Sequence, residues 1–127
     1  MNDLKRLEVK YVRDGIKNLY RKADSCDICG TSENLQYHHY NSMDLLWTRW
    51  KLANKVSPPT SAEEIMSLRQ LFYKDHWNEV VEDCATLCSM HHKMLHNIYG
   101  ATPPLATANK QKAWVVLRNA RETKNSA

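Results

Sequence analysis

The grouping of metal-binding side chains is the feature that most constrains how this chain can fold. All four cysteines and five of the six histidines lie in two stretches, residues 26–40 and residues 83–96. Within these stretches a cysteine pair has C-x2-C spacing, and two histidines are four residues apart. Both spacings are typical of zinc-binding proteins, because a tight turn or one face of a helix then presents two ligands to the same ion. We therefore expect a small fold organised around bound metal.

The cellular compartment decides whether four cysteines form disulfides or bind metal. The first ten residues, MNDLKRLEVK, carry charge from the third position, and no apolar run approaches the roughly 18 residues that span a bilayer. We therefore expect no signal peptide, no membrane anchor and a cytoplasmic, intracellular protein. Disulfides are rare in that reducing compartment, which favours metal binding.

Length and charge set broader limits. A chain of 127 residues is typical of one domain, so residues 1–127 are expected to form a single domain. Its 18 Lys and Arg residues outnumber its 14 Asp and Glu residues, which gives a net charge of +4 and a pI near 8.9. This balance permits contact with a polyanion such as nucleic acid but does not by itself establish it.

Helix is expected to dominate, because three glycines, one Phe and few β-branched runs argue against a large sheet. Residues 4–21 place apolar and basic side chains at three- and four-residue steps, which indicates an amphipathic helix. Its basic edge consists of Arg6, Lys10, Arg13, Lys17 and Arg21. Such an edge either contacts phosphates or is an ordinary solvated face, and the pattern leaves both interpretations open.

Residues 41–77 separate the two ligand-rich stretches and indicate two further helices. Apolar side chains mark them at helical spacing: Met43, Leu46, Trp47 and Trp50 in the first, and Ile65, Leu68 and Phe72 in the second. Two prolines end the first helix, and a capping box of Ser61 and Glu64 begins the second. Because Trp47 and Trp50 share an apolar stripe, we expect them in the core rather than on a base-stacking platform.

Residues 101–127 are expected to form a linker, ATPPLAT, followed by a last helix. This helix is predicted to turn apolar side chains inward and basic side chains outward. The inward set is Ala113, Val116, Leu117 and Ala120, and the outward set is Lys110, Arg118 and Arg121.

Two short β-prone runs, LQYHH and ATL, precede a helix predicted between the N-cap Ser89 and the C-cap Gly100. A two-stranded hairpin that leads into a helix is therefore expected. On that helix His92 and His96 are four residues apart and share one face, so both can bind one metal.

The predicted ligands divide into two sites. Two pairs at knuckle spacing combine into a closed Cys3His structural zinc site. They are Cys26 with Cys29, and Cys88 with His91. The three remaining histidines leave one coordination position open, as a catalytic ion requires. They are His38, His92 and His96.

Two other assignments stay open. Cys26 and Cys29 could bind zinc together with His92 and His96, because H-x3-H is also zinc-finger spacing. Alternatively, Cys84 could replace His91 at the structural zinc, although a free buried cysteine is also an ordinary core residue.

The segments CDICG, LQYHHY and NEVVEDCATLCSMHHKMLH together resemble the HNH endonuclease family. The resemblance implies an α+β, mostly helical fold with a ββα-metal core of the HNH, or His-Me finger, type and a structural zinc site. The core would comprise residues 26–40 and 78–100, with a basic N-terminal helix at 1–22, a helical insertion at 41–77, and a linker and C-terminal helix at 101–127.

The chain departs from the family pattern in three places. His91 stands where the family often has a cysteine, and Asp83 takes the place of the name-giving asparagine. About forty residues separate the paired histidines from Asp83, which is a longer excursion than the minimal motif has.

The resemblance also implies an activity, the metal-dependent hydrolysis or nicking of phosphodiester bonds in DNA. It implies His39 as the general base, with Asp83 accepting a hydrogen bond that orients its ring. One divalent ion would be held by His38, His92 and His96. An imidazole trio binds Mn²⁺, Ni²⁺, Co²⁺ or Zn²⁺ more tightly than Mg²⁺, although Mg²⁺ stays a candidate because it is abundant.

The partner implied is DNA, expected to be double-stranded, with no membrane. The terminal basic helices would contact its phosphates through Arg118 and Arg121 as well as the basic edge of residues 4–21. Similarity to small phage-type HNH proteins indicates a phage or mobile-element origin, and leaves a homodimer or an accessory phage protein as a further partner. The alternative function is a noncatalytic zinc-stabilised module that binds nucleic acid or protein. Such a module would need only the zinc ligands, whereas this chain also has the trio, His39 and Asp83.

Overall fold

The computed structural model describes residues 2–17 and 19–125, with side chains described for residues 7–17 and 19–123. Most of these residues are helical, and a two-stranded antiparallel sheet makes the fold α+β. The elements in chain order are α1 (Asn2–Ile16), β1 (Leu35–His39), α2 (Met43–Ala53), α3 (Ala62–Asp75), the π-helix η1 (Asn78–Glu82), β2 (Cys84–Cys88), α4 (Ser89–Tyr99), the 3-10 turn η2 (Leu105–Thr107) and α5 (Ala108–Asn125). None of the helices in the described part of the chain is long and apolar enough to cross a membrane.

The sheet pairs the two runs that carry metal-ligand candidates. β1 coincides with LQYHH, and β2 extends the predicted ATL run by one cysteine at each end. The strands are antiparallel, with His38 opposite Ala85 and His39 opposite Cys84. α4 follows β2 directly, so the expected order of two paired strands and a helix is confirmed. α2, α3 and η1 lie between the strands in sequence, so no tight hairpin turn joins them.

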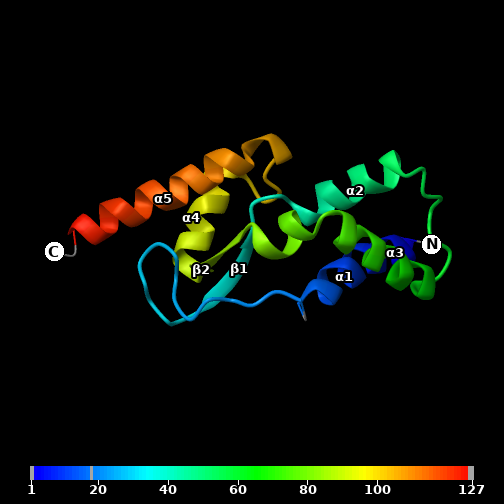
Figure 1. Cartoon of the computed structure of the whole chain (residues 1–127), viewed down its shortest axis with the longest axis horizontal. Helices are drawn as coiled ribbons and strands as arrows, with labels where there is room; N and C mark the ends of the chain where they lie inside the picture. Colours follow the sequence, from blue (N-terminus) through cyan, green and yellow to red (C-terminus); the bar gives the residue numbers. More distant parts are fainter. Residues whose placement is uncertain (1, 18, 126–127) are drawn as a thin grey trace.

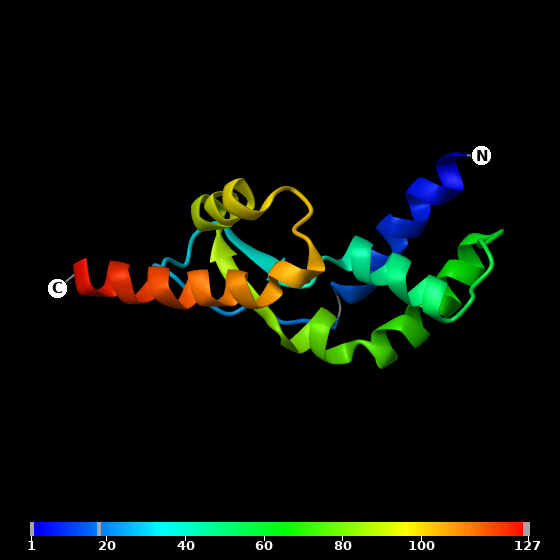
Figure 2. The ribbon, with the colours of Figure 1, turned by 90° about the horizontal axis from the view of Figure 1, so that it is seen from above.

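Figure 1 shows two groups of elements side by side, and Figure 2 shows the same division from above. We call α1, α2 and α3 the helical half. Its core is made of large side chains, among them the fully buried Trp47, Phe72 and Tyr73. Trp47 and Trp50 stack with ring centroids 5.4 Å apart, and each indole donates a hydrogen bond to a carboxylate. The predicted core role of both tryptophans is confirmed.

The second group, which we call the sheet half, consists of β1, β2, α4, α5 and the loop of residues 21–34. Its core is built mainly from smaller side chains, which include Ile28, Ala85, Leu87, Leu95 and Val115. Both ligand-rich stretches belong to this half.

Helix boundaries follow the capping signals with small shifts. Ser61 caps α3 by accepting from the Glu64 amide at 3.2 Å, and the Glu64 carboxylate accepts from the Thr60 amide at 2.7 Å. Gly100 caps α4 as predicted, but Cys88 rather than Ser89 is the N-cap. α1 ends at Ile16, where the Lys17 amide bonds to the Asp14 carbonyl and the Leu19 amide to the Ile16 carbonyl, the i to i−3 pattern of a tighter turn. Arg21 therefore lies outside the helix predicted to reach it.

The predicted inward face of α5 is wrong. Val116 and Leu117 are 67% and 69% exposed, and Ala113 and Ala120 are exposed as well. The buried side chains are instead Gln111 and Val115, on the opposite side of the helix. The apolar spacing predicted the wrong face because the inward face includes the buried Gln111. The folded protein supplies hydrogen-bond partners for both its amide oxygen and its amide nitrogen.

Candidate metal centres and active-site cleft

The first metal-ligand cluster consists of Cys26, Cys29, Cys88 and His91, and we call it the four-ligand cluster. One ligand atom from each residue lies within 4.8 Å of the others. The Cys29 and Cys88 sulfurs are 3.9 Å apart, and Cys88 Sγ is 3.2 Å from His91 Nδ1. Sulfurs bound to one tetrahedral zinc lie roughly 3.8 Å apart, given a Zn–S distance of about 2.3 Å. The residues present therefore fit a zinc ion.

Local structure brings these ligands together from two segments. Cys26 and Cys29 lie on one tight turn, closed by a 2.9 Å hydrogen bond from the Gly30 amide to the Cys26 carbonyl. Cys88 ends β2, and His91 follows in the first turn of α4. Burial and the neighbouring Cys26 raise the pKa of Cys29 to about 11, so thiolates at this position require a cation beside them.

Neither alternative ligand set matches this grouping. Cys84 lies outside the cluster, where its thiol donates to the Glu79 carbonyl at 3.6 Å and burial raises its pKa to about 12. His92 and His96 group with His38 rather than with Cys26 and Cys29.

The second cluster is the histidine trio of His38, His92 and His96. His92 Nε2 lies 3.1 Å from His38 Nδ1 and 3.0 Å from His96 Nε2. Nitrogens that bind one ion at about 2.1 Å lie roughly 3.0 to 3.4 Å apart, so the spacing fits a single metal. Burial lowers the pKa of His38 to about 3 and that of His92 to about 4, which keeps these two rings neutral and able to bind metal at physiological pH.

The outer nitrogen of each ring in the trio has a hydrogen-bond acceptor. His38 Nε2 donates to Gln111 Oε1 at 2.7 Å, and His92 Nδ1 donates to Gln36 Oε1 at 2.7 Å. His96 Nδ1 donates to the Gly100 carbonyl at 2.8 Å. With the protons on the outer nitrogens, three lone pairs face one another, an arrangement that a cation between them stabilises.

His39 lies beside the trio with one nitrogen already bonded. Its Nε2 donates to the Val80 carbonyl at 2.9 Å. A carbonyl only accepts, so the proton stays on Nε2 and Nδ1 retains its lone pair. Burial lowers the pKa of His39, so the ring is neutral at physiological pH. His39 and the trio line one cleft of about 380 Å³.

A family model, that of the phage T5 nicking endonuclease family, matches residues 1–126. The chain belongs to this nicking endonuclease family. Membership supports the predictions of an endonuclease that nicks DNA and of a phage origin. No solved structure matches the chain.

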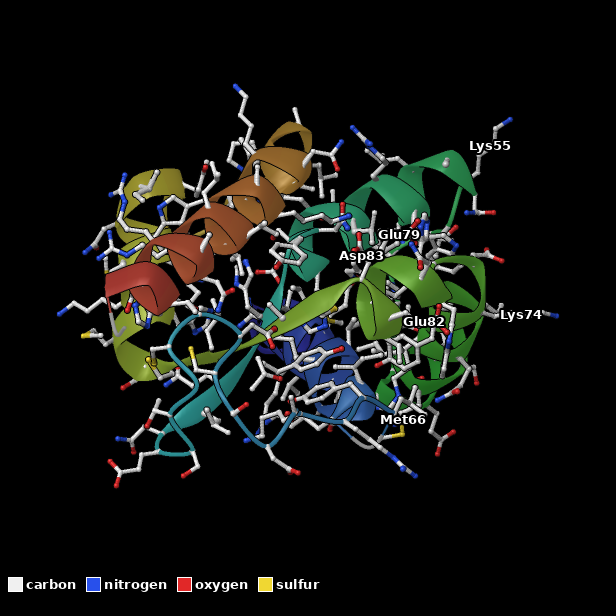
Figure 3. All side chains as sticks on the ribbon, turned by 60° about the vertical axis from the view of Figure 1, so that its left-hand side comes forward. Lys55, Met66, Lys74, Glu79, Glu82 and Asp83 are labelled. Atoms are coloured by element: carbon white, nitrogen blue, oxygen red, sulfur yellow. The ribbon has the colours of Figure 1, made fainter. Side chains whose placement is uncertain are left out.

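In this nicking endonuclease the predicted hydrogen bond between His39 and Asp83 is wrong. Asp83 forms an ion pair with Lys112 of α5, and the acceptor at His39 is the Val80 carbonyl. Figure 3 shows Asp83 at the junction of η1 and β2, near Glu79 and Glu82. η1 is a π-helix, and its i to i+5 bond joins the Asp83 amide to the Asn78 carbonyl. Pattern reasoning missed Val80 because a backbone acceptor leaves no side-chain signature.

The cleft of the nicking endonuclease has an aromatic and basic wall. Tyr20 stacks on Tyr37 with ring centroids 3.7 Å apart, and Tyr37 meets the His39 ring edge-on at 5.1 Å. Arg13, in the last turn of α1, and Lys17, just after the end of α1, line the same cleft. Arg13 also pairs with Asp44 at 2.8 Å. Arg13 and Lys17 thus form a basic wall, and the sheet half provides the candidate metal ligands.

None of the other predicted DNA-contacting residues with a described side chain lines this cleft. Lys10 and Arg21 are exposed, and the side chain of Arg6 lies outside the described residues. Arg118 pairs with Glu122 at 2.9 Å. Arg118 and Arg121 line a separate cavity of about 160 Å³ on α5.

Proposed function

We propose that this nicking endonuclease is an HNH enzyme with a ββα-metal core, and that its catalytic residues are those of the cleft. The trio would hold one divalent cation, His39 would be the general base, and the four-ligand cluster would hold a structural zinc. The observation that carries the proposal is the position of His39. A neutral imidazole, with its Nε2 proton held by the Val80 carbonyl, lines the same cleft as three converging metal ligands.

The chain's own groups perform the proton transfer. Val80 holds the His39 ring so that Nδ1 takes the proton from the attacking water. Stacked Tyr20 and Tyr37 restrict rotation of the His39 ring. The trio of His38, His92 and His96 would hold a divalent ion, which would supply Lewis-acid stabilisation of the charge on the phosphate and on the leaving 3′ oxygen.

Substrate binding would use the basic wall. Arg13, in the last turn of α1, and Lys17, just after the end of α1, line the cleft and can contact phosphates on either side of the scissile bond. Such contacts are independent of sequence, so they position the backbone rather than select bases. Arg118 and Arg121 would extend the contact surface along α5 if the DNA bends around the sheet half.

Asp83 takes a structural role in this mechanism. Its ion pair with Lys112 links the start of β2 to α5. The ion pair would thereby hold the end of η1 and the Val80 carbonyl in place, so Asp83 would act on His39 only through Val80.

The test is a nicking assay on supercoiled plasmid with zinc-loaded protein in Mg²⁺, Mn²⁺, Ni²⁺ or Co²⁺, beside EDTA. His39→Ala should lower the rate by about 100- to 10,000-fold, as loss of a general base does. The matched control is His76→Ala, because His76 pairs with Glu79 outside both clusters and should leave the rate nearly unchanged.

Metal-dependent nicking that His39→Ala abolishes and His76→Ala retains would support the proposal. Equal nicking by wild type and the folded His39→Ala variant would exclude His39 as the base. Absence of nicking by folded, zinc-loaded wild type in every metal would favour the noncatalytic binding module instead.

A further inference from the structure

α5 directs three polar side chains toward the metal centres. Gln111 bonds to His38 of the trio, Glu122 bonds to His91 of the four-ligand cluster, and Asn119 bonds to the Ile28 carbonyl between Cys26 and Cys29. Gln111 and Glu122 are eleven residues apart, which is three helical turns and about 16 Å. Figure 1 shows α5 extending across the sheet half, and its hydrogen bonds reach both centres.

Gln111 is held so that only its carbonyl oxygen can face the trio. Its side chain is fully buried. Its amide nitrogen donates to the Tyr40 carbonyl at 3.1 Å and to Thr107 Oγ1 at 2.9 Å, which uses both of its N–H groups. Oε1 is therefore the atom 2.7 Å from His38 Nε2. An acceptor at that position keeps the proton on Nε2 and directs the lone pair of Nδ1 toward His92.

Glu122 has the equivalent relation to the four-ligand cluster. Its carboxylate lies 2.7 Å from His91 Nε2, while His91 Nδ1 faces Cys88. Arg118 also contacts this carboxylate at 2.9 Å. The acceptor on Nε2 leaves Nδ1 unprotonated, which is the form that binds zinc.

We propose that α5 positions ligand histidines of both metal centres, by hydrogen bonds to the ring nitrogens that face away from the metal. In this arrangement Gln111 is the positioning residue that sets the His38 tautomer, and Glu122 is the positioning residue that sets the His91 tautomer. The inference rests on the proposed function, because it assumes that the trio and the four-ligand cluster bind metal. It goes further by assigning a role to a helix that the ligand motifs do not include.

The test combines two readouts on zinc-loaded protein. The first is the His38 tautomer, from long-range ¹H–¹⁵N correlation spectra recorded without added metal. The second is Co²⁺ affinity of the trio, from the visible absorption of bound Co²⁺. Co²⁺ does not displace zinc from the four-ligand cluster, because zinc binds nitrogen and sulfur ligands more tightly.

The key variant is Gln111→Met, which keeps the side-chain length and removes the acceptor. It should lose the Nε2–H tautomer of His38 and weaken Co²⁺ binding by about 10- to 100-fold, as outer partners of metal ligands typically do. Gln111→Glu restores an acceptor and should recover both readouts. The matched control is Leu117→Ala on the exposed side of α5, which should change neither.

A second arm addresses the other end of the helix. Glu122→Ala should weaken zinc binding by about 10- to 100-fold and leave the Co²⁺ affinity of the trio unchanged, whereas Glu122→Gln should retain zinc. This arm tests the proposal even if Gln111→Met does not fold.

The outcomes separate the inference from the function on which it rests. Unchanged tautomer and Co²⁺ affinity in Gln111→Met, or equal losses in Leu117→Ala, would overturn the role of α5 while leaving the nuclease proposal intact. Wild type that binds no Co²⁺ outside the four-ligand cluster would overturn both.

Discussion

The helical half and the sheet half reach stability by different physical means. In the helical half, Trp47, Phe72 and Tyr73 are almost wholly buried and pack ring against ring. In the sheet half, the core residues Ala85, Leu87 and Leu95 are smaller, and the sheet has only two strands. Two strands are marginally stable by themselves in water. If both ligand clusters bind metal as proposed, the sheet half would depend on its metal ligands for stability, whereas the helical half depends on apolar burial.

The cleft lies where these two halves meet. Arg13 of α1 and Lys17 just after it line the cleft on one side, and β1 and α4 contribute the trio from the sheet half. A change confined to one half should therefore affect stability and metal binding separately. A change where the halves meet should alter substrate binding.

Removal of zinc should have the largest effect, and it should fall on the sheet half. Structural zinc contributes about 10 to 16 kcal/mol in small motifs, which exceeds the net stability of many domains. Chelation should abolish hydrogen-exchange protection of β1, β2 and α4 at chelator concentrations that leave α1 and α3 partly protected. Exchange measured by mass spectrometry checks this, with zinc re-addition as the control. Simultaneous loss in both halves would contradict the division.

Trp47→Ala should have the next largest effect, confined to the helical half. Loss of a fully buried aromatic side chain costs about 3 to 5 kcal/mol. We expect that decrease in the free energy of unfolding by urea, with the zinc content of the folded protein unchanged. Trp77→Ala is the matched control, because Trp77 is 41% exposed and should cost about 1 kcal/mol or less. Comparable losses in the two variants would show that the aromatic core does not dominate.

Gly15→Ala tests how closely α1 and α3 approach each other. An added Cβ would collide with Tyr73 Oη and lie 2.9 Å from the Arg69 side chain. Overpacking of this kind costs about 1 to 3 kcal/mol, whereas alanine elsewhere in a helix stabilises by roughly 0.5 to 1 kcal/mol relative to glycine. We therefore expect a lower free energy of unfolding by urea denaturation. A stabilised variant would show that the contact relaxes freely.

Arg13→Ala should have the smallest effect on stability but a measurable effect on DNA binding. Its ion pair with Asp44 is exposed and should contribute about 1 kcal/mol or less. Loss of one phosphate contact should reduce the slope of log affinity against log salt by about 1.

Fluorescence anisotropy with duplex DNA measures that slope, and Lys74→Ala is the control. Lys74 points into solvent at the end of the helical half in Figure 3. Equal slopes for wild type and Arg13→Ala would exclude Arg13 from the DNA interface.

Local spacing made much of this molecule predictable. C-x2-C and H-x3-H bring Cys26 next to Cys29 and His92 next to His96 through a single turn of chain, so their proximity needs no tertiary structure. The strands, the Ser61 cap and the buried stripe of α2 followed from patterns of equally short range.

Long-range contacts were beyond such patterns. Which side of α5 faces inward depends on Gln111, which bonds to His38 of β1, to the Tyr40 carbonyl just after β1 and to Thr107 of η2. The partner of His39 is a backbone carbonyl of a π-helix rather than the expected Asp83 side chain.

The sequence by itself determined which residues can bind metal and which helices and strands present them, because ligand chemistry and short-range periodicity are properties of neighbouring residues. Only the tertiary structure decided which of the two ring nitrogens carries the proton in His38, His39 and His91. That choice depends on Gln111, Glu122 and the Val80 carbonyl, which come from distant parts of the chain and contact the rings only in the folded molecule.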